Sequence, residues 1–208
     1  SYDRNYVLNE ASFNIPVGSF TAITGPSGIG KSTLLKLLLG IFRLENGQMY
    51  ADCGNHKVPI NRGSRHLFAY VPQGNLLLSG TLRDNLLIVR PDATEEELQQ
   101  AIYISAMDEF MPQLPHGLDT VLGEGGAGLS EGQGQRLALA RAILWGAPIL
   151  LLDESTSALD GDTERVVLER IRSLKDRTCF AVTHRPATLE LCDWQLQIEN
   201  GKIWMKEI

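Results

Sequence analysis

The sequence predicts an α/β fold with a largely parallel central sheet. Short strand-like runs alternate with helical ones over most of the 208 residues, as they do when helices connect the strands of one sheet. The run at 149–152 is apolar throughout, too short for a helix and followed by acids, which is typical of a buried parallel strand. A glycine-rich loop at 25–30 lies between a strand-like segment and a helical one, which favours the same fold class.

Hydrophobic periodicity places the individual elements. A leucine-rich buried helix is expected at 32–39, and apolar alternation up to Asn200-Gly201 predicts a hairpin at that turn. Turn residues on either side of 48–50 predict a small antiparallel β subdomain. The expected strands lie at residues 12–15, 20–24, 48–50, 67–71, 149–152, 179–182, 194–198 and 203–205.

The chain fits a single domain, residues 1–208, because a hydrophobic content of 43% supports one substantial core. Between 81 and 145 the pattern becomes mostly helical, and Thr94 with Glu97 supplies a capping box for one of these helices. We therefore expect a helical subdomain at about 81–145, inserted into a core formed by about 1–80 and 146–208.

Composition argues against several classes of protein. A formal net charge of −6 disfavours a basic surface that would bind nucleic acid. No apolar stretch approaches the roughly 18 residues of a membrane-spanning helix. The polar N-terminus is unlike a signal peptide and lacks Met, so we expect a soluble fragment of a longer polypeptide. The three cysteines, Cys53, Cys179 and Cys192, form no CxxC pair and are expected to be reduced thiols.

The segment from Gly25 to Ser32 matches the phosphate-binding loop pattern GxxxxGK[ST]. Glycines let backbone N–H groups close around phosphate oxygens, and the following helix presents its positive end to the same anion. Lys31 is expected to reach the β and γ phosphates of ATP, and the Ser32 hydroxyl to ligate Mg²⁺. The alternative is a glycine turn that merely precedes a helix. The residues expected to contact ATP here are Gly25, Pro26, Ser27, Gly28, Ile29, Gly30, Lys31, Ser32 and Thr33.

Two acids, Asp153 and Glu154, follow the apolar run at 149–152, at the edge of the sheet where ligands bind in open α/β folds. Beside a phosphate loop, Asp153 would hold Mg²⁺ directly or through water. Glu154 would then polarise the attacking water as a general base. Taken alone, the two acids are as readily explained as ordinary loop residues.

The sequence Leu129-Ser130-Glu131-Gly132-Gln133 resembles LSGGQ, the signature of the ABC transporter family, and 135–142 continues in that family's style. Glu131 stands where the family carries glycine. Ser130 followed by Gln133 is also a helix N-cap pattern, and the free N–H groups of a helix start suit an anion. A simple cap is the alternative. The resemblance implies that Ser130, Gly132 and Gln133 contact nucleotide.

Two single residues resemble further family positions. Gln73, which follows 67–71, is similar to the glutamine that senses Mg²⁺ and the lytic water. His184, which follows 179–182, is similar to the switch histidine at the γ-phosphate. A lone histidine is more often an ordinary loop or core residue, but its place after a strand favours function.

The resemblance also covers residues 157–160 and the N-terminus. Residues 157–160 are similar to the D-loop, which runs along a partner subunit, and this implies nucleotide contact for Asp160. Tyr2 resembles the aromatic residue that stacks on adenine. Tyr6 is the competing choice, and a disordered terminal tyrosine is the alternative for either.

The resemblance implies that the site is shared by two domains. Two such domains would pair head to tail, with ATP between Lys31 of one and Ser130 of the other. A homodimer is expected, and a heterodimer is the alternative. ATP-driven closure, followed by hydrolysis, would move an attached transmembrane domain at the cytoplasmic face of a membrane.

Two segments resemble the exporter branch of the family. Residues 78–85 are similar to the part that follows the Gln73 loop, and 122–126 to the exporter X-loop. Gly125-Gly126 stand where an arginine is common. For 81–85, a capped surface helix is the alternative.

Other ATPases with the same signature are the rival hypotheses. Chromosome-maintenance and break-repair ATPases place a long coiled coil between loop and signature, whereas the chain between Lys31 and Ser130 has no sustained heptads. A translation or regulatory ATPase would need a second such domain in the full chain. A non-hydrolysing module is disfavoured by the presence of Lys31, Asp153, Glu154 and His184.

Overall fold

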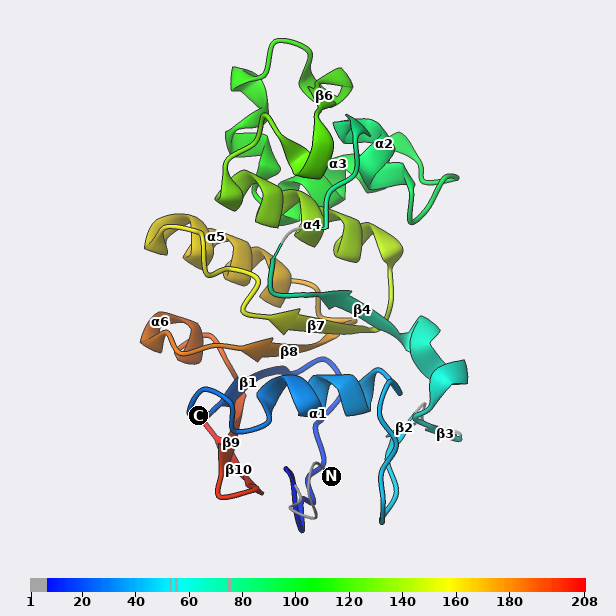
Figure 1. Cartoon of the computed structure of the whole chain (residues 1–208), viewed down its shortest axis with the longest axis vertical. Helices are drawn as coiled ribbons and strands as arrows, with labels where there is room; N and C mark the ends of the chain where they lie inside the picture. The colour runs from blue at the N-terminus through cyan, green and yellow to red at the C-terminus, as the bar shows by residue number, and fades with distance from the viewer. Residues whose placement is uncertain (1–6, 53, 55, 75) are drawn as a thin grey trace.

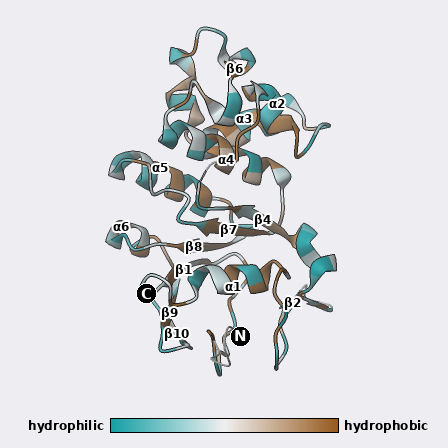
Figure 2. Ribbon diagram, viewed as in Figure 1, coloured by the Kyte–Doolittle hydropathy of each residue, from teal (hydrophilic) through white to brown (hydrophobic). Residues whose placement is uncertain are grey.

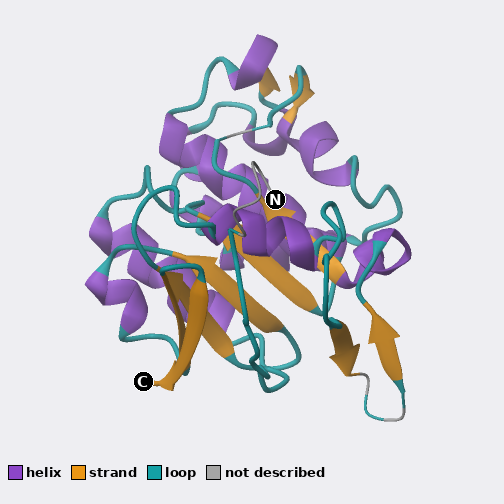
Figure 3. Cartoon of the chain, turned by 60° about the horizontal axis from the view of Figure 1, so that its bottom comes forward, coloured by secondary structure: helices purple, strands orange, loops and turns teal. Residues whose placement is uncertain are grey.

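The computed structural model describes residues 7–52, 54, 56–74 and 76–208. Its centre is a six-stranded sheet in the order β10-β9-β1-β8-β7-β4 (Figures 1 and 3). The sheet is parallel except for the β9–β10 hairpin, whose turn residues Asn200 and Gly201 both have positive φ, as a tight hairpin requires. The strands are β1 (Phe20–Thr24), β4 (Phe68–Val71), β7 (Ile149–Asp153), β8 (Thr178–Val182), β9 (Trp194–Glu199) and β10 (Lys202–Glu207).

Helices cover both faces of the sheet because side chains alternate along each strand. Leu151 and its neighbours on one face pack against α1 (Lys31–Leu38). Leu150 and Leu152 point to the opposite face and pack with residues of α4 (Glu131–Trp145) and α5 (Gly161–Arg172). Figure 2 shows the central strands as a hydrophobic layer between these helices.

The part between β4 and β7 contains α4 and two shorter helices that contact it, α2 (Leu82–Leu87) and α3 (Glu95–Ile104). Thr81, Thr94 and Ser130 begin α2, α3 and α4 with capping boxes, as the sequence predicts for the last two. Leu82 and Leu86 are fully buried, so α2 is not a mere surface helix. The short elements here are β5 (Gly80–Thr81), which pairs with β6 (Val121–Leu122), and η2 (Met107–Glu109), η3 (Met111–Gln113), η4 (Gly117–Asp119) and η5 (Glu124–Gly126).

The structure differs from the expected elements in a few places. Residues 12–15 are not a strand; Phe13 and Ile15 pack against the α1 side of the core, so their alternation reports burial without a paired partner. The antiparallel pair of β2 (Tyr50–Asp52) and β3 (Lys57–Pro59) starts at 50, not 48. The remaining elements are η1 (Arg62–Leu67) before β4, and α6 (Pro186–Leu189) after β8.

Within the described ranges, none of the helices has the length and apolar content that crossing a membrane demands. Cys179 and Cys192 are buried free thiols. Burial raises the pKa of Cys179 well above its usual value and that of Cys192 to about 12. These shifts favour the protonated thiol of both residues at neutral pH, while Cys53 lies outside the described residues.

Candidate active site

The loop between β1 and α1 has a backbone that only glycine tolerates at its two ends. Gly25 and Gly30 have φ of 144° and 120°. A Cβ on Gly25 would lie 2.6 Å from the Ile198 carbonyl oxygen, and one on Gly30 would lie 2.8 Å from Val7 Cγ1. The glycines of the motif therefore shape the loop.

Lys31 lies inside the curve of this loop. Its side chain is buried, and Nζ donates hydrogen bonds to the carbonyl oxygens of Gly25 at 2.8 Å and Pro26 at 3.0 Å. Pro26, Ser27 and Gly28 form the exposed tip. The ammonium group is thus held at the base of the loop, where phosphate oxygens are expected.

Asp153, the last residue of β7, meets the first turn of α1. Its Oδ1 lies 3.5 Å from Ser32 Oγ, and its Oδ2 accepts a hydrogen bond from the Tyr70 hydroxyl at 3.0 Å. Burial, and next the Asp153 carboxylate, raise the pKa of Tyr70 well above its usual value, so Tyr70 remains a donor. A hydroxyl and a carboxylate oxygen side by side are hard-oxygen donors that fit Mg²⁺ beside phosphate. Thr33 follows in the same turn of α1, half-buried.

Glu154 lies between Gln73 and His184. Gln73 Nε2 donates a hydrogen bond to Glu154 Oε2 at 2.9 Å, and His184 Nε2 is 3.6 Å from Glu154 Oε1. The three side chains follow the carboxyl ends of β4, β7 and β8, which are neighbours in the sheet. The structure therefore gathers these predicted residues at the edge where the loop after β1 also lies.

The signature segment begins α4 with a reciprocal cap. Ser130 Oγ accepts from the Gln133 N–H at 3.2 Å, and Gln133 Oε1 accepts from the Ser130 N–H at 2.9 Å. Ser130 and Glu131 are exposed. A Cβ on Gly132 would lie 3.0 Å from the Ala158 carbonyl oxygen, so this glycine lets α4 approach the loop before α5.

The signature and the phosphate loop lie on helices that cover opposite faces of the sheet (Figure 1). Among the hydrogen bonds between described residues, those of Ser130 and Gln133 stay within the α4 cap. One chain therefore offers the two motifs on separate surfaces.

Asp160 begins α5 as its N-cap residue. Oδ1 accepts from the Thr163 N–H at 3.0 Å, and Oδ2 accepts from the Thr163 hydroxyl at 2.8 Å. These hydrogen bonds lower the pKa of Asp160. The contact predicted for Tyr2, and its alternative at Tyr6, lie outside the described residues.

Several polar residues near the site were not predicted from the sequence. Tyr70 lies next to Asp153, and Gln135, Glu164 and Arg185 surround the loop between Glu154 and α5. The spacing of apolar residues could have indicated that two of them are buried. Glu164 lies on the face of α5 that buries Val167 and Leu168, and Gln135 precedes an apolar run in α4.

Comparison with known proteins decides the family. The sequence profile described as "ABC transporter" matches residues 8–157, more than half of the chain. The chain belongs to the ABC transporter family. The resemblance seen in the signature is thereby confirmed.

Individual relatives of this ABC domain are exporters by name. The ATP-dependent lipid A-core flippase of Desulfotalea psychrophila is 39% identical over 204 residues, which cover 98% of this chain and 36% of the flippase. A putative multidrug export ATP-binding/permease protein of Staphylococcus aureus is 41% identical over 198 residues, 95% of this chain and 34% of that protein. The ABC domain thus spans about a third of the length of these relatives.

A solved structure confirms the fold class. The structure of a bacterial Atm1-family ABC exporter with ATP bound matches with a TM-score of 0.88 and 34% sequence identity, over 100% of this chain and 37% of that one. The expected P-loop α/β core with a mostly parallel sheet is therefore correct.

Proposed function

We propose that this ABC domain binds and hydrolyses ATP, and that it powers export through membrane-spanning segments of a longer protein. The observation that carries the proposal is the convergence of Lys31, Asp153, Gln73, Glu154 and His184 at the carboxyl edge of the sheet. The exporter names of the relatives support the transport part.

Each side chain has a defined task in this proposal. Lys31 exchanges the carbonyls of Gly25 and Pro26 for phosphate oxygens, because charged acceptors bind an ammonium more strongly than neutral ones. Glu154 takes a proton from the attacking water as general base, and His184 lies beside Oε1 of this carboxylate.

Ser32 and Asp153 would hold Mg²⁺. Gln73, which donates a hydrogen bond to the neighbouring Glu154, would contact the same ion. When bound, Mg²⁺ neutralises charge on the phosphates. Among the described residues, no group of three or more His, Cys, Asp or Glu side chains forms a metal cage. In this proposal, phosphate oxygens of the nucleotide and water complete the coordination, as is usual for Mg²⁺.

The proposal includes a head-to-tail homodimer. ATP bound by the partner would be contacted by Ser130, Gly132, Gln133 and Asp160. The start of α4 is exposed and lies on the opposite side of the sheet from α1, which fits a contact between two copies. The domain would lie at the cytoplasmic face of a membrane. Adenine stacking by Tyr2 is part of the same proposal.

The test is phosphate release by the purified chain with ATP and Mg²⁺. Glu154→Gln keeps an oxygen that accepts from Gln73 but removes the base, so the rate is expected to fall by about 10²-fold or more. Glu169→Gln, on the exposed side of α5, is the matched control and keeps the native rate. Full hydrolysis by Glu154→Gln would refute the assignment.

The same variant tests the dimer. With hydrolysis slowed, ATP and Mg²⁺ should convert Glu154→Gln to a particle of twice the mass in light scattering. A particle that stays monomeric at saturating ATP, with ATP binding shown by calorimetry, would contradict a shared site.

A further inference from the structure

Glu164 places a carboxylate in the interior of the domain. The residue is only 3% exposed, on the face of α5 that packs in the core. A buried carboxylate is costly unless it is paired and hydrogen-bonded. Here Glu164 Oε1 accepts from the Thr156 hydroxyl at 2.7 Å and the Thr188 hydroxyl at 3.3 Å, and Oε2 pairs with the Arg185 guanidinium. Every oxygen of this carboxylate is satisfied.

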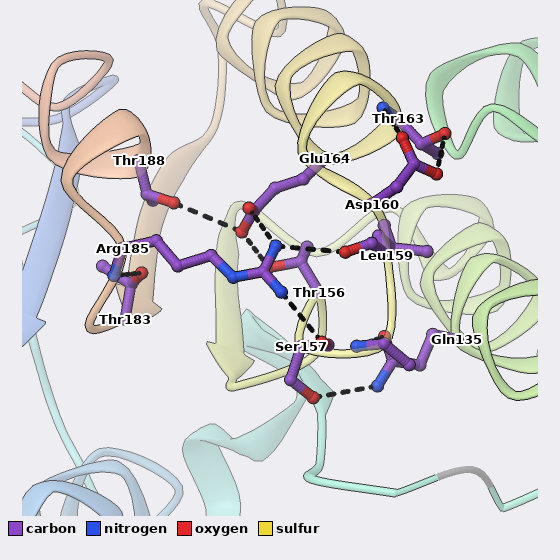
Figure 4. Close-up of polar contacts among 11 residues, drawn as sticks. Gln135, Thr156, Ser157, Leu159, Asp160, Thr163, Glu164, Thr183, Arg185 and Thr188 are labelled. Carbon is purple, nitrogen blue, oxygen red and sulfur yellow. Dashed lines mark hydrogen bonds and ion pairs between the residues drawn. The ribbon is translucent and has the colours of Figure 1, made fainter.

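Arg185 also donates two hydrogen bonds to the loop between Glu154 and α5. Nη1 donates to the Leu159 carbonyl at 3.1 Å, and Nη2 donates to the Ser157 carbonyl at 2.9 Å (Figure 4). A planar guanidinium can contact a carboxylate and two carbonyls at once, which an ammonium group cannot do with the same geometry.

Gln135 of the signature helix α4 holds the same loop from its other side. Its Oε1 accepts from the Ala158 N–H at 3.0 Å, and its Nε2 donates to Ser157 Oγ at 3.2 Å. Gln135 is 3% exposed. Consecutive backbone groups at 157, 158 and 159 are thus fixed between a side chain from α4 and one that follows β8.

These hydrogen bonds lie next to His184 and Glu154, the two side chains proposed to act in hydrolysis. Arg185 directly follows His184, and its N–H donates to Thr183 Oγ1 at 3.0 Å, so the backbone on both sides of His184 is restrained. Thr156, which binds Glu164, is two residues after Glu154. His184 and Glu154, 3.6 Å apart, thus belong to two segments, one after β8 and one after β7. The ion pair between Arg185 and Glu164 connects these segments.

We propose that Arg185 and Glu164 are positioning residues for ATP hydrolysis, which hold His184, Glu154 and the start of the signature helix in one fixed arrangement. The inference rests on the proposed ATPase function. Arg185 does not need to touch nucleotide for this; it acts through the loop at 155–160 and through Gln135.

The variant that isolates this role is Arg185→Lys. It keeps a cation opposite Glu164, so no unpaired charge is buried, but it loses the fork that binds Ser157 and Leu159. We expect kcat to fall by about 10- to 100-fold, since small displacements of reacting groups cost that much, while KM for ATP changes less than about twofold because the phosphate loop is intact. Arg165→Lys, on the exposed face of α5 beside Glu164, is the control.

A readout without nucleotide accompanies the kinetics. Amide exchange of the 155–160 segment should become several-fold faster in Arg185→Lys and stay native in Arg165→Lys. Gln135→Met should give the same kcat loss at constant KM, and it stands in if Arg185→Lys does not fold. Native kcat in either folded variant, or equal changes in kcat and KM, would overturn the proposal. If the native chain releases no phosphate, the proposed function fails instead.

Discussion

The Tyr70 hydroxyl donates a hydrogen bond to Oδ2 of Asp153, across 3.0 Å and from a neighbouring strand. In the parallel register, Tyr70 lies beside Leu151, and Asp153 is two residues further along β7 on the same face of the sheet. The bond therefore orients the carboxylate so that its other oxygen, Oδ1, faces Ser32.

Tyr70→Phe removes this donor without changing the ring that packs beside it. We expect half-maximal hydrolysis to require about 10-fold more Mg²⁺, because partners that orient metal ligands commonly contribute that much to metal affinity. A Mg²⁺ titration of phosphate release at saturating ATP measures the shift. Tyr103→Phe, at an exposed tyrosine, is the control. An unchanged Mg²⁺ dependence would mean that Asp153 is oriented without Tyr70.

Lys31→Ala should abolish most ATP affinity. One hydrogen bond to a charged group contributes about 1.5 to 3 kcal/mol, and its loss lowers affinity about 10- to 150-fold. Calorimetry with ATP and Mg²⁺ gives Kd, and a melting curve checks that the loop without its lysine still folds. Lys36→Ala, on the exposed side of α1, should bind ATP as the native chain does. Equal affinity of the two variants would place the phosphates elsewhere.

Asp160→Ala tests the cap of α5 through pH. Since hydrogen bonds from Thr163 lower the folded-state pKa of Asp160, its contribution to stability is full above the unfolded-state pKa of about 4 and disappears as pH falls through the folded-state value. The Tm of Asp160→Ala should therefore lie below the native Tm at pH 7, and the two should converge in acid. Asp162→Ala, in the same helical turn without the cap contacts, is the comparison. A Tm difference independent of pH would contradict an ionised cap.

Glu131→Gly restores the glycine usual in the signature and should have two opposite effects. A carboxylate in the first turn of a helix is favoured by about 0.3 to 1 kcal/mol, so the variant is expected to melt slightly earlier. In the dimer the same charge would face polyphosphate and repel it, so ATP-driven dimerisation should become stronger. Glu131→Gln separates charge from backbone freedom. Dimerisation that does not change at low salt, where screening is weakest, would show that the charge points away from nucleotide.

The sequence predicts those parts of the site that depend on local patterns. The glycines at 25 and 30, the caps at Thr94 and Ser130 and the acids after 149–152 each combine a residue type with a neighbouring element. Because carboxyl ends of parallel strands share one edge, local predictions also bring Gln73, Glu154 and His184 to the same place.

The remaining contacts depend on strand order and register, which local patterns do not encode. β1 lies between β9 and β8, far from its neighbours in sequence. Tyr70 finds Asp153 only through the register of β4 with β7, and Arg185 finds Glu164 only because α5 and the segment after β8 pack together. Apolar alternation at 12–15 was misleading for the same reason: burial on one side does not supply a hydrogen-bonded neighbour.

The backbone at Glu154 has a consequence for how variants of this domain would be found. With φ of 50°, the residue adopts a left-handed conformation that costs roughly 1 to 2 kcal/mol for most side chains. Asparagine accepts this conformation more readily, so Glu154→Asn should raise the melting temperature while removing the base. Selection for heat resistance alone would therefore favour replacing the residue that we propose as the general base.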